Sequence, residues 1–294
     1  MVNGVSSKST TPFQQDQPSQ AEPQVQRARL PFPLRAVREH WKMAATFATI
    51  FLLWELAVWV FAVKPYILPR PSLVFTQMGA RLPSVLDGAL ATLQPMLIGY
   101  ALAVLIGVLL ALMVAFSQTF RETLYPVIVF LQIVPKIAIA PLFLIWFGYG
   151  LLPKVLLVFL LSFFPIVVSA VSAFRSVDTD IMDLARTTGA GRLRIFWKVQ
   201  LPHALPMLFT GFKVAAALSA TGALVAEFVA SDRGLGYMLV GYSNNMDTPM
   251  AFATIIVISV MGLALYSVIE FAERVAIPWH VSRRSGEADL QANA

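Results

Sequence analysis

The sequence predicts an all-α protein that crosses a membrane about six times. Of the 294 residues, 57% are hydrophobic and only 13% are charged, whereas a soluble domain usually has about 25% charged residues. Six apolar runs are long enough to cross the roughly 30 Å hydrocarbon core of a bilayer. The short segments of alternating polarity that a membrane β-barrel requires do not occur. These observations together favour a polytopic helical membrane protein.

The six expected spans contain few charged residues and several prolines and glycines. They cover residues 44–63, 89–116, 123–147, 155–174, 206–230 and 250–269. Membrane helices tolerate proline because neighbouring helices can satisfy the freed backbone groups. The small-residue run over 215–224, "AAALSATGAL", predicts close approach of the fifth span to a neighbouring helix.

The distribution of Lys and Arg predicts the orientation. With the N-terminus in the cytoplasm, fifteen of the 22 Lys and Arg residues fall in inner segments and five in outer segments. Inner loops of membrane proteins carry such an excess. Both termini are therefore expected in the cytoplasm, and the net charge of +6 is explained by topology. Nucleic-acid binding is not needed to account for it.

Three regions follow from composition. Residues 1–40, rich in Gln, Ser and Pro, predict a disordered cytoplasmic tail. Residues 41–280 form the expected transmembrane domain, with a cytoplasmic loop at 175–205, and residues 281–294 form a C-terminal tail. In the first outer segment, Ser72 is expected to cap a short helix.

The cytoplasmic loop contains the stretch "DLARTTGAGRLRIFWKVQLP". A short helix is expected to begin at Asp178 or Thr179 and to end at Gly189 in a left-handed conformation. A second short helix should follow and end at Leu201 and Pro202, and Pro206 should open the fifth span. This basic amphipathic pair could rest on anionic lipid or could form a docking surface for a cytoplasmic partner.

The same stretch resembles the cytoplasmic-loop signature of ATP-binding-cassette importer permeases, which runs Glu-Ala-Ala, three residues, Gly, nine residues, Ile-x-Leu-Pro. The spacing is complete, with Asp, Leu and Val as mild departures at three positions. The matching residues are Asp183, Leu184, Ala185, Gly189, Val199, Leu201 and Pro202. From about residue 68 to 280 the chain resembles the nitrate, sulfonate and taurine branch, through segments such as "VPKIAIAPLFLIWFGYG" and "LVAEFVASDRGLGYML". The ending "ERVAIPWHVS" also resembles permeases for pyrimidine or riboflavin-type vitamin precursors.

The resemblance implies the smaller, type I importer fold in a bacterial inner membrane. It implies a permease subunit, not an enzyme, in which two copies form a path for a small solute. It further implies that the loop helix sits in a cleft of a separate ATPase subunit, which binds ATP, and that an extracytoplasmic solute-binding protein delivers the cargo. The implied cargo is a sulfonate, taurine, nitrate or a vitamin precursor.

Catalytic and metal sites are not predicted. The sequence has no G-x-x-x-x-G-K-[ST] motif for nucleotide phosphates and no Cys. Its three His residues, His40, His203 and His280, are far apart and lack converging carboxylates. No catalytic, cofactor-binding or metal-binding residue is therefore assigned, and ATP hydrolysis is expected on another polypeptide.

Charges inside a membrane are costly and are functional candidates by default. Lys136 and Glu227 are candidates for a translocation path or gate, although Lys136 could instead pair with Glu55 or Glu227 and only fix helix packing. Lys213 is expected to snorkel to the inner surface. Two other functions stay open from the residues alone. One is a secondary transporter that uses Lys136 and Glu227 for ion coupling, and the other is a membrane scaffold without transport.

Overall fold

The computed structural model describes residues 32–279, and all regular elements in this range are helical. The first helix begins at Phe32, inside the range predicted as a disordered tail. The remainder of that tail, residues 1–31, and the C-terminal tail lie outside the described residues. Residues 1–50 and 51–294 form two separate units. In the first unit, the described part of α1 exposes apolar side chains such as Phe47 and Ile50.

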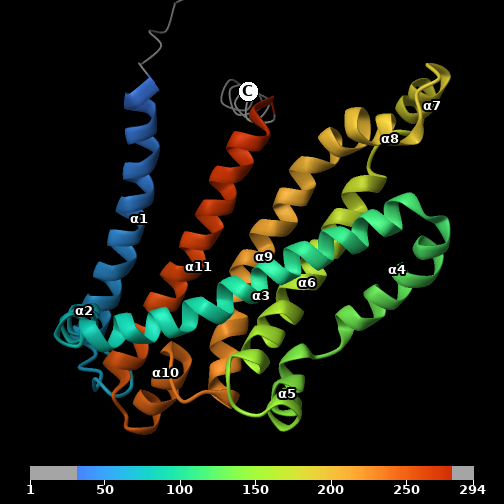
Figure 1. Cartoon of the computed structure of the whole chain (residues 1–294). Coiled ribbons are helices and arrows are strands. Elements are labelled where there is room, and N and C mark those ends of the chain that lie inside the picture. The colour runs from blue at the N-terminus through green and yellow to red at the C-terminus, as the bar shows by residue number, and fades with distance from the viewer. Residues whose placement is uncertain (1–31, 280–294) are drawn as a thin grey trace, which may run out of the picture. The chain divides into compact units, whose positions relative to one another are not determined.

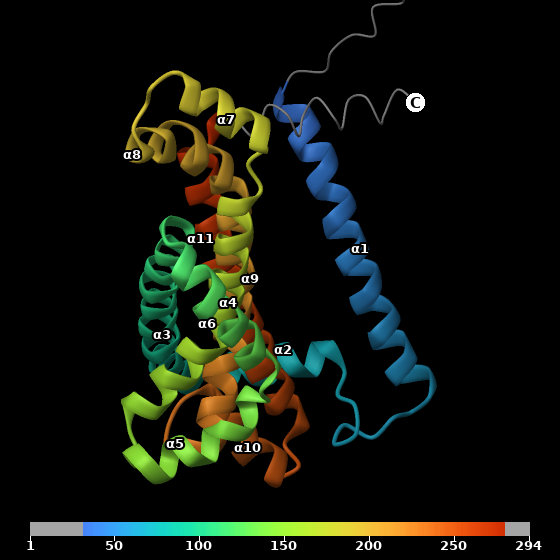
Figure 2. The ribbon, with the colours of Figure 1, turned by 90° about the vertical axis from the view of Figure 1, so that its right-hand side faces the viewer.

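The helices form long rods joined by short turns (Figures 1 and 2). In chain order they are α1 (Phe32–Val60), α2 (Pro71–Ala80), α3 (Leu82–Phe116), α4 (Gln118–Ile133), η1 (Lys136–Ile139), α5 (Ala140–Phe147), α6 (Leu151–Arg175), α7 (Thr179–Thr187), α8 (Arg192–Ile195), η2 (Phe196–Gln200), α9 (Leu201–Ala230), α10 (Leu235–Asn244) and α11 (Thr248–Ala276).

The core is built around α6, which packs along both α3 and α9. Glycines allow this close approach. A Cβ atom on Gly99 of α3 would lie 2.6 Å from the Cβ of Val158 on α6, and one on Gly222 of α9 would lie 3.0 Å from the Cα of Val158. Most of the small residues predicted to pack closely are buried, including Ala216 and Ala223, whereas Ala217 and Thr221 are exposed. The helices therefore meet almost backbone to backbone, as small residues permit in membrane proteins.

Within residues 32–279, four helical stretches are long and apolar enough to cross a membrane, namely 82–116, 151–175, 192–229 and 248–276. A fifth apolar stretch, expected as one straight span over 123–147, is bent by 83° between α4 and α5. The bend follows from Pro135, which has no N–H to continue the helix and disfavours helical geometry at the residue before it. The apolar part of α1, residues 45–60, is a shorter helix.

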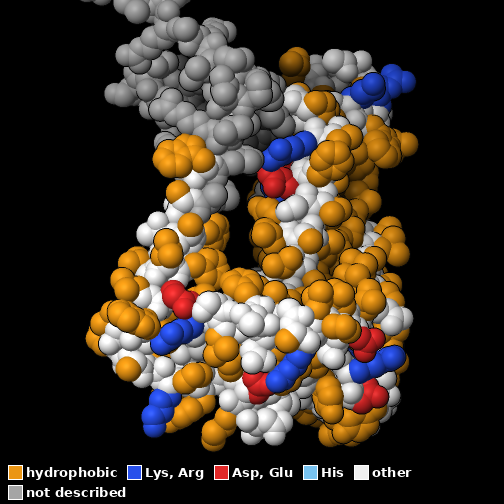
Figure 3. All heavy atoms as spheres, turned by 90° about the vertical axis from the view of Figure 1, so that its left-hand side faces the viewer, with side chains coloured by type: hydrophobic (Ala, Val, Ile, Leu, Met, Phe, Trp, Pro, Cys, Tyr) orange, Lys and Arg blue, Asp and Glu red, His pale blue; other side chains and the backbone are white. Residues whose placement is uncertain are grey.

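Many large apolar side chains are exposed on the part of the chain that the structure describes. Figure 3 shows hydrophobic side chains over most of one face, with only a few charged groups. Many large apolar residues are more than half exposed, among them Leu90, Ile133, Ile145, Leu263 and Phe271. A soluble monomer rarely exposes so much contiguous apolar area. This surface suits contact with lipid and with other membrane subunits.

Candidate functional site

The helix α7 is defined by caps at both ends, as the sequence predicts. The side chain of Asp178 accepts a hydrogen bond of 2.9 Å from the backbone N–H of Asp180, which satisfies one of the free donors of the first turn. At the other end Gly189 has φ of +73°, a left-handed conformation that glycine adopts without steric cost. A nine-residue helix with a fixed exit direction results.

The second half of the loop differs from the prediction. It does not end at Leu201 and Pro202. The helical backbone continues from α8 through a π-helical turn at η2 into α9, and both Phe196 and Leu201 have helical dihedral angles. A π-helical turn uses i→i+5 hydrogen bonds. This wider turn gives room for the ring of Pro202 and removes the need for its missing N–H.

The loop presents apolar side chains to its surroundings. None of the residues of α7 is buried. Leu184 is 68% exposed, and Ile181, Leu193 and Trp197 are also exposed. Only Ile195 and Phe196 anchor the loop in the core, and the ring of Phe196 packs against those of Phe116 and Phe174. The seven signature residues thus lie on one loop with an exposed apolar face at its α7 end.

Charged groups on the loop are mostly basic. Asp183 forms an ion pair of 2.7 Å with Arg186 on the same helix, and both side chains are about two-thirds exposed. No acidic residue lies between Leu184 and Glu227 in the sequence. Behind α7, a cavity of about 550 Å³ is lined by residues such as Gln118, Met182 and Arg186. The exposed face and this cavity together give the loop two surfaces for a partner.

A second polar cluster lies near the C-terminal end of α9. Glu227 is 1% exposed. One of its carboxylate oxygens, Oε2, accepts hydrogen bonds from the Thr92 hydroxyl on α3 at 3.0 Å and from the Gly236 N–H at 2.7 Å. Thr92 Oγ1 in turn accepts the Leu235 N–H at 2.9 Å. Two helices thus supply the cap for the N-terminus of α10, whose own N-cap position, Gly234, has no side chain.

Glu227 therefore lies in a structural cap, and its other carboxylate oxygen, Oε1, has no hydrogen-bond partner among the described residues. Nearby, the buried Lys154 donates a hydrogen bond of 2.6 Å to the Ser231 hydroxyl. Sequence reasoning identified Glu227 but missed Thr92 and Lys154. The signal for Lys154 was weak, because it follows the outer turn that contains Gly150 and looked like an ordinary boundary cation.

Lys136 lies at the break between α4 and α5. Its Nζ donates a hydrogen bond of 2.6 Å to the Gln132 carbonyl and lies 4.7 Å from the ring centroid of Phe164. It pairs with neither Glu55 nor Glu227, so the alternative of a packing ion pair is wrong. The break at Pro135 leaves carbonyls of the last turn of α4 without a partner, and Lys136 satisfies one of them.

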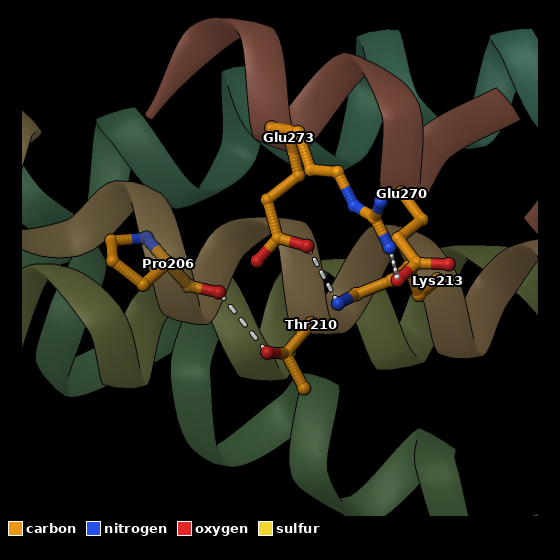
Figure 4. A network of polar contacts seen from close by, with 6 residues as sticks. Pro206, Thr210, Lys213, Glu270 and Glu273 are labelled. Carbon is orange, nitrogen blue, oxygen red and sulfur yellow. Dashed lines mark hydrogen bonds and ion pairs between the residues drawn. The ribbon is translucent and has the colours of Figure 1, made fainter. Parts of the chain in front are cut away.

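Lys213 also differs from the prediction, because it does not snorkel. It is buried in the α9–α11 contact and forms an ion pair of 2.7 Å with Glu273, with both side chains 9% exposed (Figure 4). An exposed pair, Glu270 and Arg274, lies next to it on α11 at 2.8 Å. The sequence has two acidic residues in the last turns of α11, Glu270 and Glu273. Glu273 is the one that contacts Lys213 on α9.

We expect Glu273→Ala to lower the free energy of unfolding by about 3–5 kcal/mol, because it leaves Lys213 charged and buried without a partner. The double variant Lys213→Met with Glu273→Leu should stay within about 2 kcal/mol of wild type. Thermal unfolding of the purified protein in detergent measures both effects. Glu270→Ala is the matched control and should cost at most about 1 kcal/mol, since its pair is exposed. Equal losses for Glu270→Ala and Glu273→Ala would contradict the assignment.

The arrangement of apolar helices around α6, with an exposed helical loop between two spans, defines a multi-pass helical membrane protein. A family model described as "Binding-protein-dependent transport system inner membrane component" matches residues 103–277. The chain belongs to this family. The match includes α6, the loop, α9 and all of α11.

Three curated relatives match this chain over most of their own length, and each is named as a transport permease protein. The chain is 33% identical over 236 residues to the "Formylaminopyrimidine transport permease protein ThiX" of Halalkalibacterium halodurans, covering 79% of this chain and 94% of that protein. It is 35% identical over 242 residues to the "Riboflavin transport system permease protein RibX" of Chloroflexus aurantiacus, covering 82% and 90%. It is 31% identical over 242 residues to the "Taurine transport system permease protein TauC" of Escherichia coli, covering 80% and 88%.

A solved structure shares the fold. A chain of the methionine ABC transporter MetNI in an inward-facing conformation superposes with a TM-score of 0.54 and 19% identity, covering 68% of this chain and 97% of that chain. The predicted type I importer fold is confirmed. The chain is a permease subunit of the ATP-binding-cassette transporter class, and the resemblance to the taurine, sulfonate and vitamin-precursor branch is confirmed as well.

Proposed function

We propose that this permease works in an ATP-driven uptake system in which a separate ATPase subunit docks on the loop between α6 and α9. The observation that carries this proposal is the exposed apolar face of α7, with Ile181 and Leu184 about half or more exposed. An amphipathic helix with such a face fits a hydrophobic groove in a partner. The ATPase binds and hydrolyses ATP, since this chain has no phosphate-binding motif.

The lipid-bound alternative for the loop is less well supported at α7. Its exposed face includes Asp180 and Asp183 as well as its apolar residues, and carboxylates near an anionic lipid surface are unfavourable. A protein partner can pair with both signs of charge. The docking surface is therefore assigned to α7 and its exit at Gly189.

Three further parts of the proposal follow the family. Two permease copies form the solute path between them, and an extracytoplasmic solute-binding protein delivers cargo to the outer loops, including 231–249. The cargo is a small solute such as a sulfonate or taurine-like anion or a vitamin precursor, as the names of the relatives suggest. Lys136 at the broken span remains a candidate for the path, and Glu227 for a gate beside α10.

The proposed orientation in the membrane rests on the excess of Lys and Arg in the segments that lie on the same side of the membrane as the loop at 175–205. We place both termini and the loop in the cytoplasm of a bacterial cell, with residues 41–280 as the permease domain in the inner membrane. Residues 1–40 and 281–294 are the two cytoplasmic tails. The short turn at 148–154 and α10 then lie on the outer side.

Reconstitution tests this proposal. Vesicles that contain the permease with its ATPase should take up radiolabelled taurine or riboflavin, presented with the binding protein, only when ATP is supplied on the ATPase side. A proton uncoupler should leave the uptake unchanged. Uptake that persists without the ATPase and collapses with the uncoupler would instead support a secondary transporter, and no flux of any presented solute would support a scaffold.

A further inference from the structure

The connection between α1 and α2 borders a pocket that is separate from the loop and from the polar cluster at Glu227. It has a volume of about 590 Å³, in the range of pockets that hold small ligands. Its apolar walls include Val58, Leu68 and Leu73, and its polar lining includes Lys64 and Arg70. An apolar pocket with cations at its rim suits a molecule that has hydrocarbon and a negatively charged group.

The pocket is held in shape by contacts from three helices. Glu55 on α1 accepts hydrogen bonds from the Ser72 N–H at 3.0 Å and from the Ser72 hydroxyl at 2.8 Å. Ser72 is thus not the cap that the sequence suggested. It lies inside α2, and Glu55 caps α2 from another helix. The connecting turn is fixed to α11 by a hydrogen bond of 2.7 Å from the Thr248 hydroxyl to the Tyr66 carbonyl.

The end of α1 also contributes to the pocket wall. Ala62 has φ of +49°, the left-handed region in which a residue with a Cβ atom is strained. The Val63 N–H donates to the Val58 carbonyl at 3.1 Å, as in a helix end closed by a left-handed residue. Glycine would relieve the strain, but the Ala62 side chain lines the pocket. Ala62 is therefore in a strained conformation, and its methyl group extends the apolar wall of the pocket.

Charge and surroundings indicate what fills the pocket. Between residues 51 and 80 the charged residues are Glu55, Lys64 and Arg70. Lys64 and Arg70 line the pocket and Glu55 does not, so the two cations give the pocket a positive rim even when the single negative charge of Glu55 is counted. Large aromatic side chains at the end of α1, Trp59 and Phe61, are 64% and 77% exposed. Aromatic residues and cations at the end of an apolar helix mark the level of the lipid headgroups.

We propose that this pocket binds one phospholipid with an anionic headgroup, such as phosphatidylglycerol. The headgroup phosphate is held by Lys64 and Arg70, and an acyl chain lies along Val58, Leu68 and Leu73. Charge complementarity and the position at the headgroup level support a lipid over a soluble anion, because a soluble anion would leave the apolar walls unfilled. The lipid then supports the junction between α1 and α2.

Lipid retention tests the proposal on the full-length protein. The protein is purified in mild detergent with equal amounts of phosphatidylglycerol and phosphatidylcholine, and bound lipids are measured by mass spectrometry. Wild type should favour phosphatidylglycerol, and Lys64→Gln with Arg70→Gln should lower this preference by about fivefold for each charge removed. Arg233→Gln, which removes an exposed cation elsewhere in the protein, is the matched control and should keep the wild-type preference.

The outcomes separate the possible occupants. The proposal is overturned if Arg233→Gln lowers the preference for phosphatidylglycerol as much as the double variant does. It is also overturned if the double variant keeps the wild-type preference. Displacement of the lipid by millimolar inorganic phosphate would show that a soluble anion is the occupant. The chain has no Cys, so Leu68→Cys introduces a single thiol. Efficient disulfide formation between two copies through this thiol, whether or not lipid is present, would show that a second protein copy fills the pocket. Gel filtration and thermal unfolding check that each variant is folded.

Discussion

Gly234→Ala is expected to lower the free energy of unfolding by about 4 kcal/mol or more and to abolish transport. Gly234 has φ of +112°, and a Cβ atom there would lie 2.3 Å from a carboxylate oxygen of Glu227. The backbone conformation alone costs about 1–2 kcal/mol for a residue with a Cβ atom. Glu227 must also move, and the buried carboxylate then loses its hydrogen bonds to Thr92 and Gly236, each worth about 1.5–3 kcal/mol.

The matched control for this prediction is Gly241→Ala in the same helix, α10. A Cβ atom on Gly241 would meet nothing within 4 Å, and Ala is a better helix former than Gly by about 1 kcal/mol. Thermal unfolding in detergent should therefore show no loss or a small gain for Gly241→Ala. Equal losses for the two variants would mean that any added side chain disrupts α10, and the role of the Glu227 cap would be wrong.

Leu184→Lys is expected to lower co-purification of the ATPase subunit at least tenfold and to stop ATP-driven uptake, while the permease stays folded in the membrane. Leu184 is 68% exposed and α7 contributes no buried side chain. The substitution therefore costs the permease itself little. A charged group placed in the centre of a protein interface without a partner typically costs several kcal/mol.

Thr179→Lys provides the control for Leu184→Lys, because it adds the same charge on another side of α7, at an exposed position. It should leave ATPase binding within about twofold of wild type. Gly189→Pro, which cannot adopt the φ of +73° that ends α7, should lower ATPase binding like Leu184→Lys. Normal binding by both Leu184→Lys and Gly189→Pro would contradict the docking role of the loop.

The long regular parts of this protein could be predicted from its sequence. Apolar runs mark α3, α6, α9 and α11, since a bilayer requires long helices that satisfy their own backbone groups. The loop was located through Asp178 and Gly189, because caps and left-handed glycines are local signals that neighbouring helices do not override. The all-α fold and the type of permease therefore follow from patterns that span at most a few tens of residues.

The parts that could not be predicted depend on contacts between distant residues. Glu227 was identified as an unusual charge, but its partners Thr92 and Gly236 lie on other helices and left no local pattern. The partner of Lys213 was missed for the same reason, since Glu273 lies 60 residues further along the chain. The bend at Pro135 was missed because membrane helices often contain proline and still cross the bilayer as one continuous span.

The same limit applies to Pro202. Its position after Leu201 suggested a helix end, since proline usually stops a helix. The five-residue π-helical turn before it provides the extra room. Such turns have no simple sequence pattern, and they depend on how the surrounding helices pack. The ion pair between Arg81 and Asp247 joins residues 166 positions apart and was likewise not foreseen. The hydrogen bond to Asp247 raises the pKa of Arg81.

One continuous helical backbone from residue 192 to 229 joins the exposed loop to the buried cluster around Glu227. Its 38 residues span roughly 57 Å at 1.5 Å per residue, far more than the thickness of the hydrocarbon layer. The π-helical turn at η2 and Pro206 lie between the basic end and the buried part of α9, and helices bend at such positions. A displacement of the loop can therefore be taken up by a bend near the start of α9, and it reaches Glu227 only to the extent that this stretch stays straight.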